Sequence, residues 1–299
     1  MIIAEHLTKR YEEITAVNAV DLTIEEGEVF GLLGTNGAGK STFLRTLAGI
    51  YKPDEGSLTL DGEPVFENEA AKRKVFYVSD EPFSFLNASP QDMIAYYCRF
   101  YPAFDRERME NMLDDFELVK NRKIKTFSKG MKKQFFLLCG ICSGAKYLLL
   151  DETFDGLDPV MRQAAKSLLA TNMIDHGQTP VIASHNLREL EDICDHVGLL
   201  HKGGVILSKD LLDLRENIHR IQCVLKEDMR VRDLQGLEII REESRGRVRI
   251  LTVRGEEESI RRIMEAAEPV FYELIPLSLE EIFISETEVA GYDIKSLIF

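Results

Sequence analysis

Short apolar runs alternate with longer stretches of helical periodicity from the start of the chain to about residue 204. Four runs, Glu28–Leu33, Val75–Ser79, Tyr147–Leu150 and Pro180–Ala183, are predicted to be buried strands because they are short, continuous and rich in branched or aromatic residues. A glycine-rich turn and a helical pattern reaching about Gly49 follow the first run directly. Strands that alternate with helices favour an α/β domain with a largely parallel sheet.

Two changes in this pattern divide the chain. Mostly helical periodicity from Gln91 to Gly144 predicts an inserted helical lobe, which we place at about residues 88–145. Beyond Gly203 the pattern changes again, so we expect one domain over 1–207 and a small accessory α+β domain over 208–299. The second domain is predicted to contain helices at 209–219, 255–267 and 278–287 and strands at Ile221–Leu225, Leu237–Ile240 and Val248–Val253. Ser278 and Glu281 have the spacing of a capping box for the last helix.

Composition limits the class of protein. The 299 residues are 44% hydrophobic and 29% charged, which excludes a disordered or fibrous chain. The formal net charge is −14, and an acidic surface repels phosphate backbones, so we expect no nucleic-acid partner. The first residues lack the features of a signal peptide, and the longest apolar stretch, Phe135–Cys142, is far shorter than the roughly 20 residues of a membrane helix. We expect a soluble intracellular protein that works at a membrane only through a partner.

Five scattered cysteines are expected to be reduced thiols, since their number is odd and their spacing gives no disulfide framework. Cys139 and Cys142 have the spacing of a redox or zinc motif. They lie in an apolar helical run without a second pair at zinc spacing, so core packing is the preferred interpretation.

The residues after the first predicted strand fit the phosphate-binding pattern G-x-x-x-x-G-K-[ST]. Its members, together with the next threonine, are Gly34, Thr35, Asn36, Gly37, Ala38, Gly39, Lys40, Ser41 and Thr42. Glycines allow the backbone to curl so that successive N–H groups point at phosphate oxygens, and the following helix adds its positive N-terminal end. Lys40 is expected to reach β- and γ-phosphates, and the Ser41 hydroxyl to bind Mg²⁺.

A second motif follows the third predicted strand, which ends in Asp151 and Glu152. The carboxyl ends of strands are where open α/β sheets bind their ligands. Asp151 is therefore expected to hold Mg²⁺, and Glu152 to polarise an attacking water. A strand ending in two acidic residues is common by itself, so this prediction depends on the glycine-rich loop.

Further motifs select a family, and the chain over about residues 2–207 resembles the ATP-binding subunit of an ABC transporter. Phe127–Met131 stands where that family carries its Leu-Ser-Gly-Gly-Gln signature, and Gly156–Pro159 follows Glu152 as the family's D-loop does. His185 occupies the place of the switch histidine, and Tyr11 that of the aromatic residue that stacks on adenine. The resemblance implies a P-loop ATPase fold with a mostly parallel core sheet, an antiparallel N-terminal β part and a helical lobe.

The resemblance also implies how the site works. Ser128 and Gly130 would bind the γ-phosphate of an ATP held by a second ATP-binding subunit, with Asp158 beside them, so that ATP joins two subunits as a homo- or heterodimer. His185 would contact the γ-phosphate and orient Glu152 and the water. Integral membrane permease subunits would dock on the helical lobe and hold the chain, a cytoplasmic protein, at the inner face of the cell membrane.

Two departures from the family pattern concern the site. Lys129 and Met131 stand where the signature usually has Gly and Gln. Asp80 stands where a glutamine normally touches Mg²⁺ and the membrane partner. A carboxylate can still bind Mg²⁺, which prefers hard oxygen ligands, so Asp80 is kept as a metal-ligand candidate. Its charge raises the question of how far the ATPase rate and coupling depend on this position.

Three functional hypotheses remain open. The leading one is a transporter ATPase, and the signature and the small C-terminal domain resemble subunits of ABC-2 type exporters, including those of peptide-antibiotic resistance. A soluble ABC ATPase acting on ribosomes or nucleic acid is the alternative, although such relatives carry two cassettes or long coiled coils, which this chain lacks. A regulatory cassette with weak turnover is the third, suggested by Asp80 and opposed by the retained Glu152 and His185.

Overall fold

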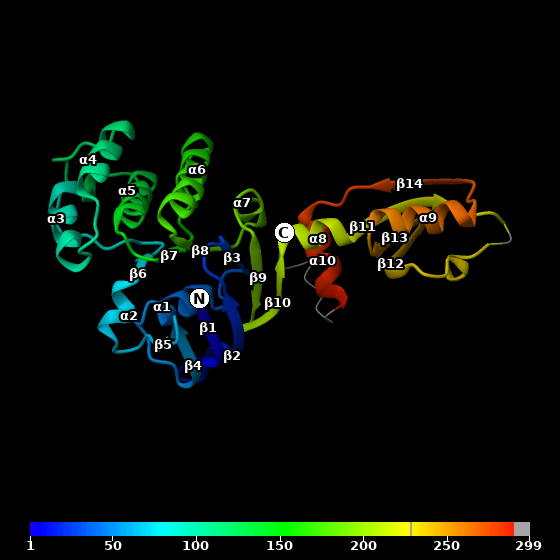
Figure 1. Ribbon diagram of the computed structural model, residues 1–299, viewed down its shortest axis with the longest axis horizontal. Coiled ribbons are helices and arrows are strands. Elements are labelled where there is room, and N and C mark those ends of the chain that lie inside the picture. The colour runs from blue at the N-terminus through cyan, green and yellow to red at the C-terminus, as the bar shows by residue number, and fades with distance from the viewer. Residues whose placement is uncertain (228, 290–299) are drawn as a thin grey trace. The chain divides into compact units, whose positions relative to one another are not determined.

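The computed structural model describes residues 1–227 and 229–289. The chain divides into two compact units, Met1–Ser208 and Lys209–Phe299, each of which is considered separately below (Figure 1). In the first unit the elements are β1 (Ile2–Tyr11), β2 (Ile14–Ile24), β3 (Phe30–Leu33), α1 (Lys40–Leu47), β4 (Glu55–Leu60), β5 (Glu63–Pro64), α2 (Glu69–Arg73), β6 (Val75–Val78), α3 (Pro90–Phe100), α4 (Arg106–Asp115), η1 (Ile124–Thr126), α5 (Lys129–Cys142), β7 (Tyr147–Asp151), α6 (Pro159–His176), β8 (Thr179–Ser184), α7 (Leu187–Glu191), β9 (His196–His201) and β10 (Gly204–Asp210), which ends just beyond the boundary.

The central sheet of the first unit has the strand order β10-β9-β3-β8-β7-β6. The pairs β9–β3, β3–β8, β8–β7 and β7–β6 are parallel. All four strands predicted from the apolar runs are present, as β3, β6, β7 and β8. Every residue of β7 and of β8 is buried, which is the pattern of parallel strands covered on both faces. The expectation of an α/β domain with a parallel sheet is confirmed.

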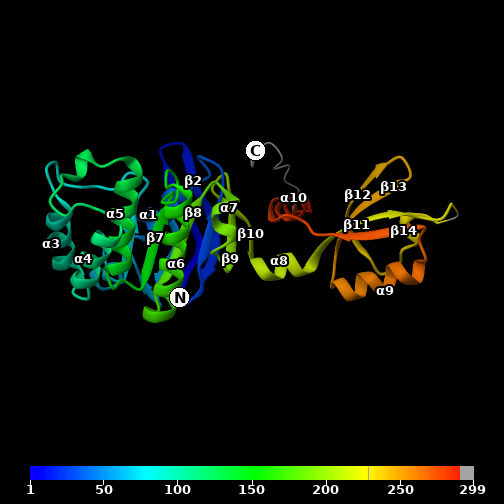
Figure 2. The same ribbon diagram turned by 90° about the horizontal axis from the view of Figure 1, so that it is seen from above.

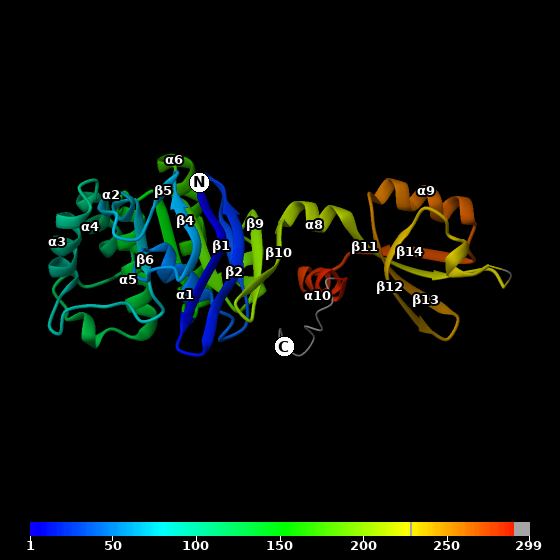
Figure 3. The ribbon, with the colours of Figure 1, turned by 90° about the horizontal axis from the view of Figure 1, so that it is seen from below.

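A second sheet in this unit has the order β2-β1-β4-β5 and is antiparallel. It lies on the opposite side of the central sheet from α5 and α6, as the two opposed views show (Figures 2 and 3). Helix α1 contributes Phe43, Leu44 and Leu47 to a core that includes buried residues of both sheets. The first turn of α1, which follows the glycine-rich loop, is thereby fixed by packing.

The inserted helical lobe consists of α3, α4 and α5, which lie together at one end of the first unit (Figure 2). Each begins at a side-chain cap that accepts a backbone N–H: Ser89, Asp105 and Ser128. Helix α5 is the most buried of the three and packs against α4, α6 and β6. Among residues 1–227 and 229–289, no helix has both the length and the apolar character needed to cross a bilayer.

The second unit is built on an antiparallel sheet. Its elements are α8 (Leu211–Asn217), β11 (Ile218–Val224), η2 (Val231–Asp233), β12 (Glu238–Arg245), β13 (Val248–Arg254), α9 (Glu257–Ala267), β14 (Phe271–Ile275) and α10 (Leu279–Val289). The strand order is β12-β13-β11-β14, and Ile260 and Met264 of α9 share a core with buried residues of β11 and β13. The capping box of α10 is present, with Ser278 and Glu281 bonded in both directions. Strand β14 had no counterpart in the sequence prediction.

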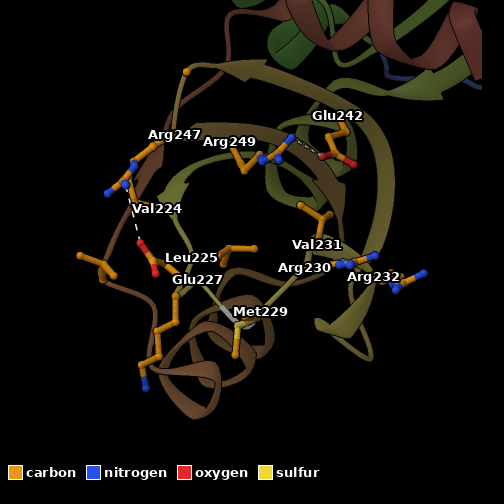
Figure 4. A pocket seen from close by; sticks show the side chains of 13 residues that line it. Val224, Leu225, Glu227, Met229, Arg230, Val231, Arg232, Glu242, Arg247 and Arg249 are labelled. Carbon is orange, nitrogen blue, oxygen red and sulfur yellow. Dashed lines mark hydrogen bonds and ion pairs between the residues drawn. The ribbon is translucent and has the colours of Figure 1, made fainter.

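A cavity of about 750 Å³ opens in the second unit, between the loop after β11 and the turn that joins β12 to β13 (Figure 4). Its lining includes Leu225 and Val231. At its rim Arg249 pairs with Glu242 at 3.3 Å, and Arg247 with Glu227 at 3.6 Å. The phosphate-binding pattern and its acidic partners all belong to the first unit, so this cavity is not part of the candidate site.

Candidate active site

The glycine-rich loop joins the end of β3 to the start of α1, and two of its glycines adopt backbone conformations that L-residues avoid. Gly37 has φ 81° and Gly39 has φ 106°. A Cβ atom at Gly39 would also meet the Ala16 carbonyl oxygen at 2.1 Å. The loop therefore requires glycine at position 39 for two independent reasons, and this geometry brings the loop backbone close to β2.

The Lys40 side chain is 5% exposed and turns back into the loop. Its ammonium donates to the carbonyl oxygens of Gly34 (2.6 Å) and Thr35 (3.2 Å). It also forms an ion pair with Glu152 Oε1 at 3.1 Å. The cation predicted to meet phosphate thus lies beside the carboxylate predicted to act on water.

Asp151 lies at the end of β7 and is 1% exposed. Ser41 donates its hydroxyl to Asp151 Oδ1 at 2.9 Å, and Tyr77 donates to Oδ2 at 2.8 Å. Burial raises the pKa of the Asp151 carboxyl, and these two hydroxyls partly oppose the shift. The structure therefore brings together Ser41 and Asp151, the two residues expected to share a cation.

Glu152 follows β7 directly and has φ 49°, a left-handed conformation that costs a non-glycine residue about 1–2 kcal/mol. Its N–H donates to the Ala183 carbonyl at 3.0 Å. Its Oε2 lies 2.8 Å from His185 Nδ1, and its side chain is only 14% exposed. The two predicted catalytic residues are thus in direct contact.

The signature residues lie at the start of α5. Ser128 caps the helix by accepting the Met131 N–H at 3.1 Å, and it is exposed. A Cβ atom at Gly130 would lie 2.9 Å from the Gly156 carbonyl oxygen, so the helix start packs closely on the loop after Glu152. Asp158 in turn caps α6, accepting two backbone N–H groups at 3.0 Å. Ser128 and Gly130 have no hydrogen bond to the glycine-rich loop among the described residues.

Tyr11 ends β1 and is 38% exposed. Its ring meets that of Tyr51 edge to face, with centroids 5.7 Å apart. Burial raises the pKa of Tyr11, and a hydrogen bond with Thr42 partly opposes this shift. Because Thr42 lies in the first turn of α1, the Tyr11 ring lies beside the start of that helix. A half-exposed aromatic ring in this place, beside the helix that follows the glycine-rich loop, is suited to stack on a base.

Comparisons with known proteins agree with this geometry. A family model described as "ABC transporter" matches residues 17–155. The lantibiotic transport ATP-binding protein SrtF of Streptococcus pyogenes is 30% identical over 74% of this chain and 95% of its own length. The bacitracin transport ATP-binding protein BcrA of Enterococcus faecalis is 30% identical over 72% of this chain and 71% of its own. The chain belongs to the ABC transporter ATP-binding proteins.

Two more likenesses extend the assignment. The ABC transporter ATP-binding protein YtrB of Bacillus subtilis is 27% identical over 96% of this chain and 98% of its own, so the likeness includes the second unit. A solved structure of an ATP-binding subunit of an ABC transporter is 25% identical, covers 72% of this chain and 92% of that chain, and has a TM-score of 0.66. The predicted ABC-type P-loop fold is confirmed, and the chain is an ATP-binding and ATP-hydrolysing transporter subunit.

Asp80 has contacts in this ABC ATPase that the sequence did not suggest. It pairs with Lys133 at 2.7 Å and with Lys129 at 3.8 Å, both from α5. Burial raises the pKa of Asp80, but the two ammonium groups outweigh it and the pKa is lowered. Among the described residues, Asp80 has no hydrogen bond or ion pair with Ser41 or Asp151. Asp80 therefore faces α5, the helix that begins at the signature residues, and not the expected magnesium ligands.

Tyr77 and Lys133 are site residues that sequence reasoning missed. Tyr77 lies in β6, where a tyrosine in an apolar strand looks like a core residue, and only the parallel register with β7 brings it to Asp151. Lys133 precedes the apolar run of α5, where a lysine is expected at the surface. The single available signal was its spacing of four residues from Lys129, which puts both on one face of the helix.

Proposed function

We propose that the chain binds MgATP at the loop Gly34–Ser41 and hydrolyses it with Glu152 as general base, and that this cycle drives membrane-embedded partner chains in export. The contact of Glu152 with both Lys40 (3.1 Å) and His185 (2.8 Å) is the observation that carries the proposal. It places one carboxylate between the cation suited to the γ-phosphate and the imidazole suited to orient a water.

The residues at the end of β7 fit a magnesium ion. Ser41 and Asp151 offer two hard oxygen atoms that already lie 2.9 Å apart, and a buried carboxylate gains from a nearby cation. Mg²⁺ usually takes one or two protein ligands together with substrate phosphates and water, which this pair would allow. When bound, the ion would neutralise charge that develops on the phosphates. Asp80 remains a candidate third ligand only if it leaves Lys133.

ATP binding would change the partners of Lys40 and thereby prepare Glu152 for hydrolysis. In the structure Lys40 bonds to the loop carbonyls and to Glu152, and ATP would replace these acceptors with phosphate oxygens. Release from Lys40 would leave the Glu152 carboxylate free to accept a proton from water. His185 would keep that carboxylate oriented through its Nδ1 contact.

A second ATP-binding subunit would complete the site, as a homodimer or a heterodimer. Ser128 is exposed at the start of α5, a 14-residue helix whose first N–H groups form an anion-binding end. Asp158 is likewise exposed at the start of α6. These two helix starts are suited to a phosphate presented by another copy rather than by the loop of their own chain.

Permease subunits are proposed to bind the helical lobe and the loop that precedes it. Phe100 of α3 is 53% exposed, and Phe83 and Phe85 of that loop are 67% and 47% exposed. Such partners would hold the chain at the cytoplasmic face of the membrane. The names of BcrA and SrtF suggest a peptide antibiotic as the class of exported substrate.

The variant Glu152→Gln tests the proposal. It should bind ATP with unchanged affinity but hydrolyse it at least about a hundredfold more slowly, because the amide cannot take a proton from water. Size-exclusion chromatography with ATP should then show a nucleotide-locked dimer. Glu25→Gln, at an exposed glutamate of the same unit, serves as the control. A Glu152→Gln variant that turns over ATP at the wild-type rate would refute the role of Glu152.

The variant Lys40→Ala tests the loop assignment. It should abolish binding of ATP in a titration with a fluorescent analogue, whereas Lys52→Ala, at an exposed lysine just beyond α1, should leave the affinity unchanged. Unchanged affinity of Lys40→Ala would mean that nucleotide binds elsewhere.

A further inference from the structure

Lys133 is a charged residue in an environment that normally excludes charge. Its side chain is 1% exposed, within a helix whose next nine residues are all buried. Positive charge also gathers near the positive end of the helix dipole, from Lys129, Lys132 and Lys133. The first turn of α5 contains no acidic residue that would offset it. Burial and dipole both oppose an ammonium here, so its partners must supply a specific compensation.

Two partners compensate this charge, and both belong to the catalytic end of the sheet. The Lys133 ammonium donates to the backbone carbonyl of Glu152 at 2.5 Å. It also pairs with Asp80 Oδ1 at 2.7 Å, an ion pair whose angles are not those of a hydrogen bond. One buried ammonium therefore joins the loop after β6 to the residue after β7.

The backbone of Glu152 is the part of the site that most needs such a restraint. Its φ of 49° is unfavourable and persists only where the surroundings fix it. Its N–H is held by Ala183, and its carbonyl accepts from Lys133 and, at 3.3 Å, from the Asp155 N–H. Holding both the N–H and the carbonyl fixes the backbone on either side of the Glu152 Cα. This sets the direction in which the side chain leaves the backbone, and so the position of the carboxylate relative to His185.

We propose that Lys133 is a positioning residue for ATP hydrolysis: its buried ammonium fixes the Glu152 backbone and couples it to the loop that carries Asp80. A movement of Asp80 would then change the donor to the Glu152 carbonyl. The proposal accounts for an aspartate at position 80, because a neutral amide there would leave the buried ammonium without its counter-charge. It rests on the proposed role of Glu152 as general base.

The test uses the full-length chain and separates positioning from stability. Lys133→Met keeps the length of the side chain but removes the charge and the donor. We expect kcat for ATP to fall about ten- to a hundredfold, since hydrogen bonds from charged groups are worth about that factor, while KM changes less than about threefold. Asp80→Asn keeps the donor to Glu152 and should lower kcat by less. Lys132→Met, one residue earlier on the same helix and only half-buried, is the matched control and should retain the wild-type kcat.

The double variant Asp80→Asn/Lys133→Met distinguishes the two roles. It contains neither buried charge, so its urea midpoint should recover relative to Lys133→Met, whereas its kcat should stay low because the Glu152 carbonyl still lacks its donor. Recovery of kcat together with stability would overturn the proposal and make the pair purely structural. If Lys133→Met does not fold, the double variant and Lys133→Gln, which keeps a donor and should regain part of kcat, carry the test.

Failure of this proposal is separable from failure of the proposed function. A folded Lys133→Met variant with the wild-type kcat, in a protein where Glu152→Gln is inactive, overturns only the positioning role. A Glu152→Gln variant with the wild-type rate overturns the catalytic assignment itself. Nucleotide affinity, measured by titration for each variant, should be unchanged in both cases because the loop at Lys40 is intact.

Discussion

Removing the Tyr77 hydroxyl would measure how much it stabilises the buried Asp151 carboxylate at the end of β7. Asp151 is 1% exposed and accepts hydrogen bonds from Ser41 and Tyr77. Tyr77→Phe removes one of these donors and leaves the ring in place. A hydrogen bond to a charged group contributes about 1.5–3 kcal/mol, so the free energy of unfolding should fall by about that amount.

Tyr101→Phe is a matched control within the same unit. Its hydroxyl donates to the Val75 carbonyl at 2.8 Å, the same length as the bond from Tyr77 to Asp151. The acceptor is neutral, so the expected loss is only about 0.5–1.5 kcal/mol. Both changes remove one phenolic hydroxyl, but the Tyr77 hydroxyl also accepts from Arg45 Nε at 3.3 Å. The difference between the two variants therefore reports the charged acceptor together with this contact.

The assay is urea denaturation followed by circular dichroism, with a chelator present so that no divalent cation meets the carboxylate. Tyr77→Phe should lower the free energy of unfolding by at least about 1 kcal/mol more than Tyr101→Phe. Equal losses in the two variants would show that Asp151 does not depend on the Tyr77 hydroxyl, and would refute the account of this site as a carboxylate held by two donors.

Three further predictions follow from other parts of the molecule. Gly39→Ala should prevent nucleotide binding or folding, because its Cβ atom would meet the Ala16 carbonyl oxygen at 2.1 Å. The Cβ atom of Gly37→Ala would have no atom within 4 Å, so this variant should cost only about 1–2 kcal/mol of backbone strain. Equal nucleotide affinities of the two variants in a titration would contradict this prediction. Burial raises the pKa of Asp61, but Lys146 and its other partners outweigh it and hold the pKa well below its usual range, so Asp61→Asn should cost about 2 kcal/mol near pH 7. That stabilisation is present above the unfolded pKa near 4 and is lost as the pH falls further, so the gap between the two urea midpoints should shrink below about pH 4 and not above it. Of the five thiols only Cys98 is not buried, so the native chain should react rapidly with at most one equivalent of a thiol reagent at pH 8, and the denatured chain with five.

The elements that the sequence predicted correctly are those with a local signal. The buried strands β3, β7 and β8 are continuous apolar runs, and α10 begins at a capping box readable from Ser278 and Glu281. Strand β14 (Phe271–Ile275) was missed because its residues are half-buried or exposed at the edge of the sheet, so its pattern is weak. The pairing β11–β14 depends on long-range contacts that no local pattern shows.

The candidate site divides in the same way. Lys40, Ser41, Asp151 and Glu152 could be found because each sits at a fixed position in a motif whose chemistry requires that residue type. Tyr77 could not, since its role arises from the register of β6 against β7. The chemistry of a residue can be predicted from its type only where its partner is also known. The partners of Tyr77 and Lys133 lie on segments that are distant in the sequence.

The departures from the family pattern gain a common explanation once their side chains are placed. Taken singly, Asp80 and Lys129 each look like a weakened motif. In space Lys129 lies between Asp80 (3.8 Å) and Asp155 (3.6 Å), and Lys133 binds Asp80 more closely. The changes therefore compensate one another in charge. Restoring a glutamine at position 80 alone would leave a buried ammonium unpaired, so Asp80→Gln should be less active than the wild type rather than more, and only its combination with Lys133→Gln tests what the family's usual residues would do in this chain.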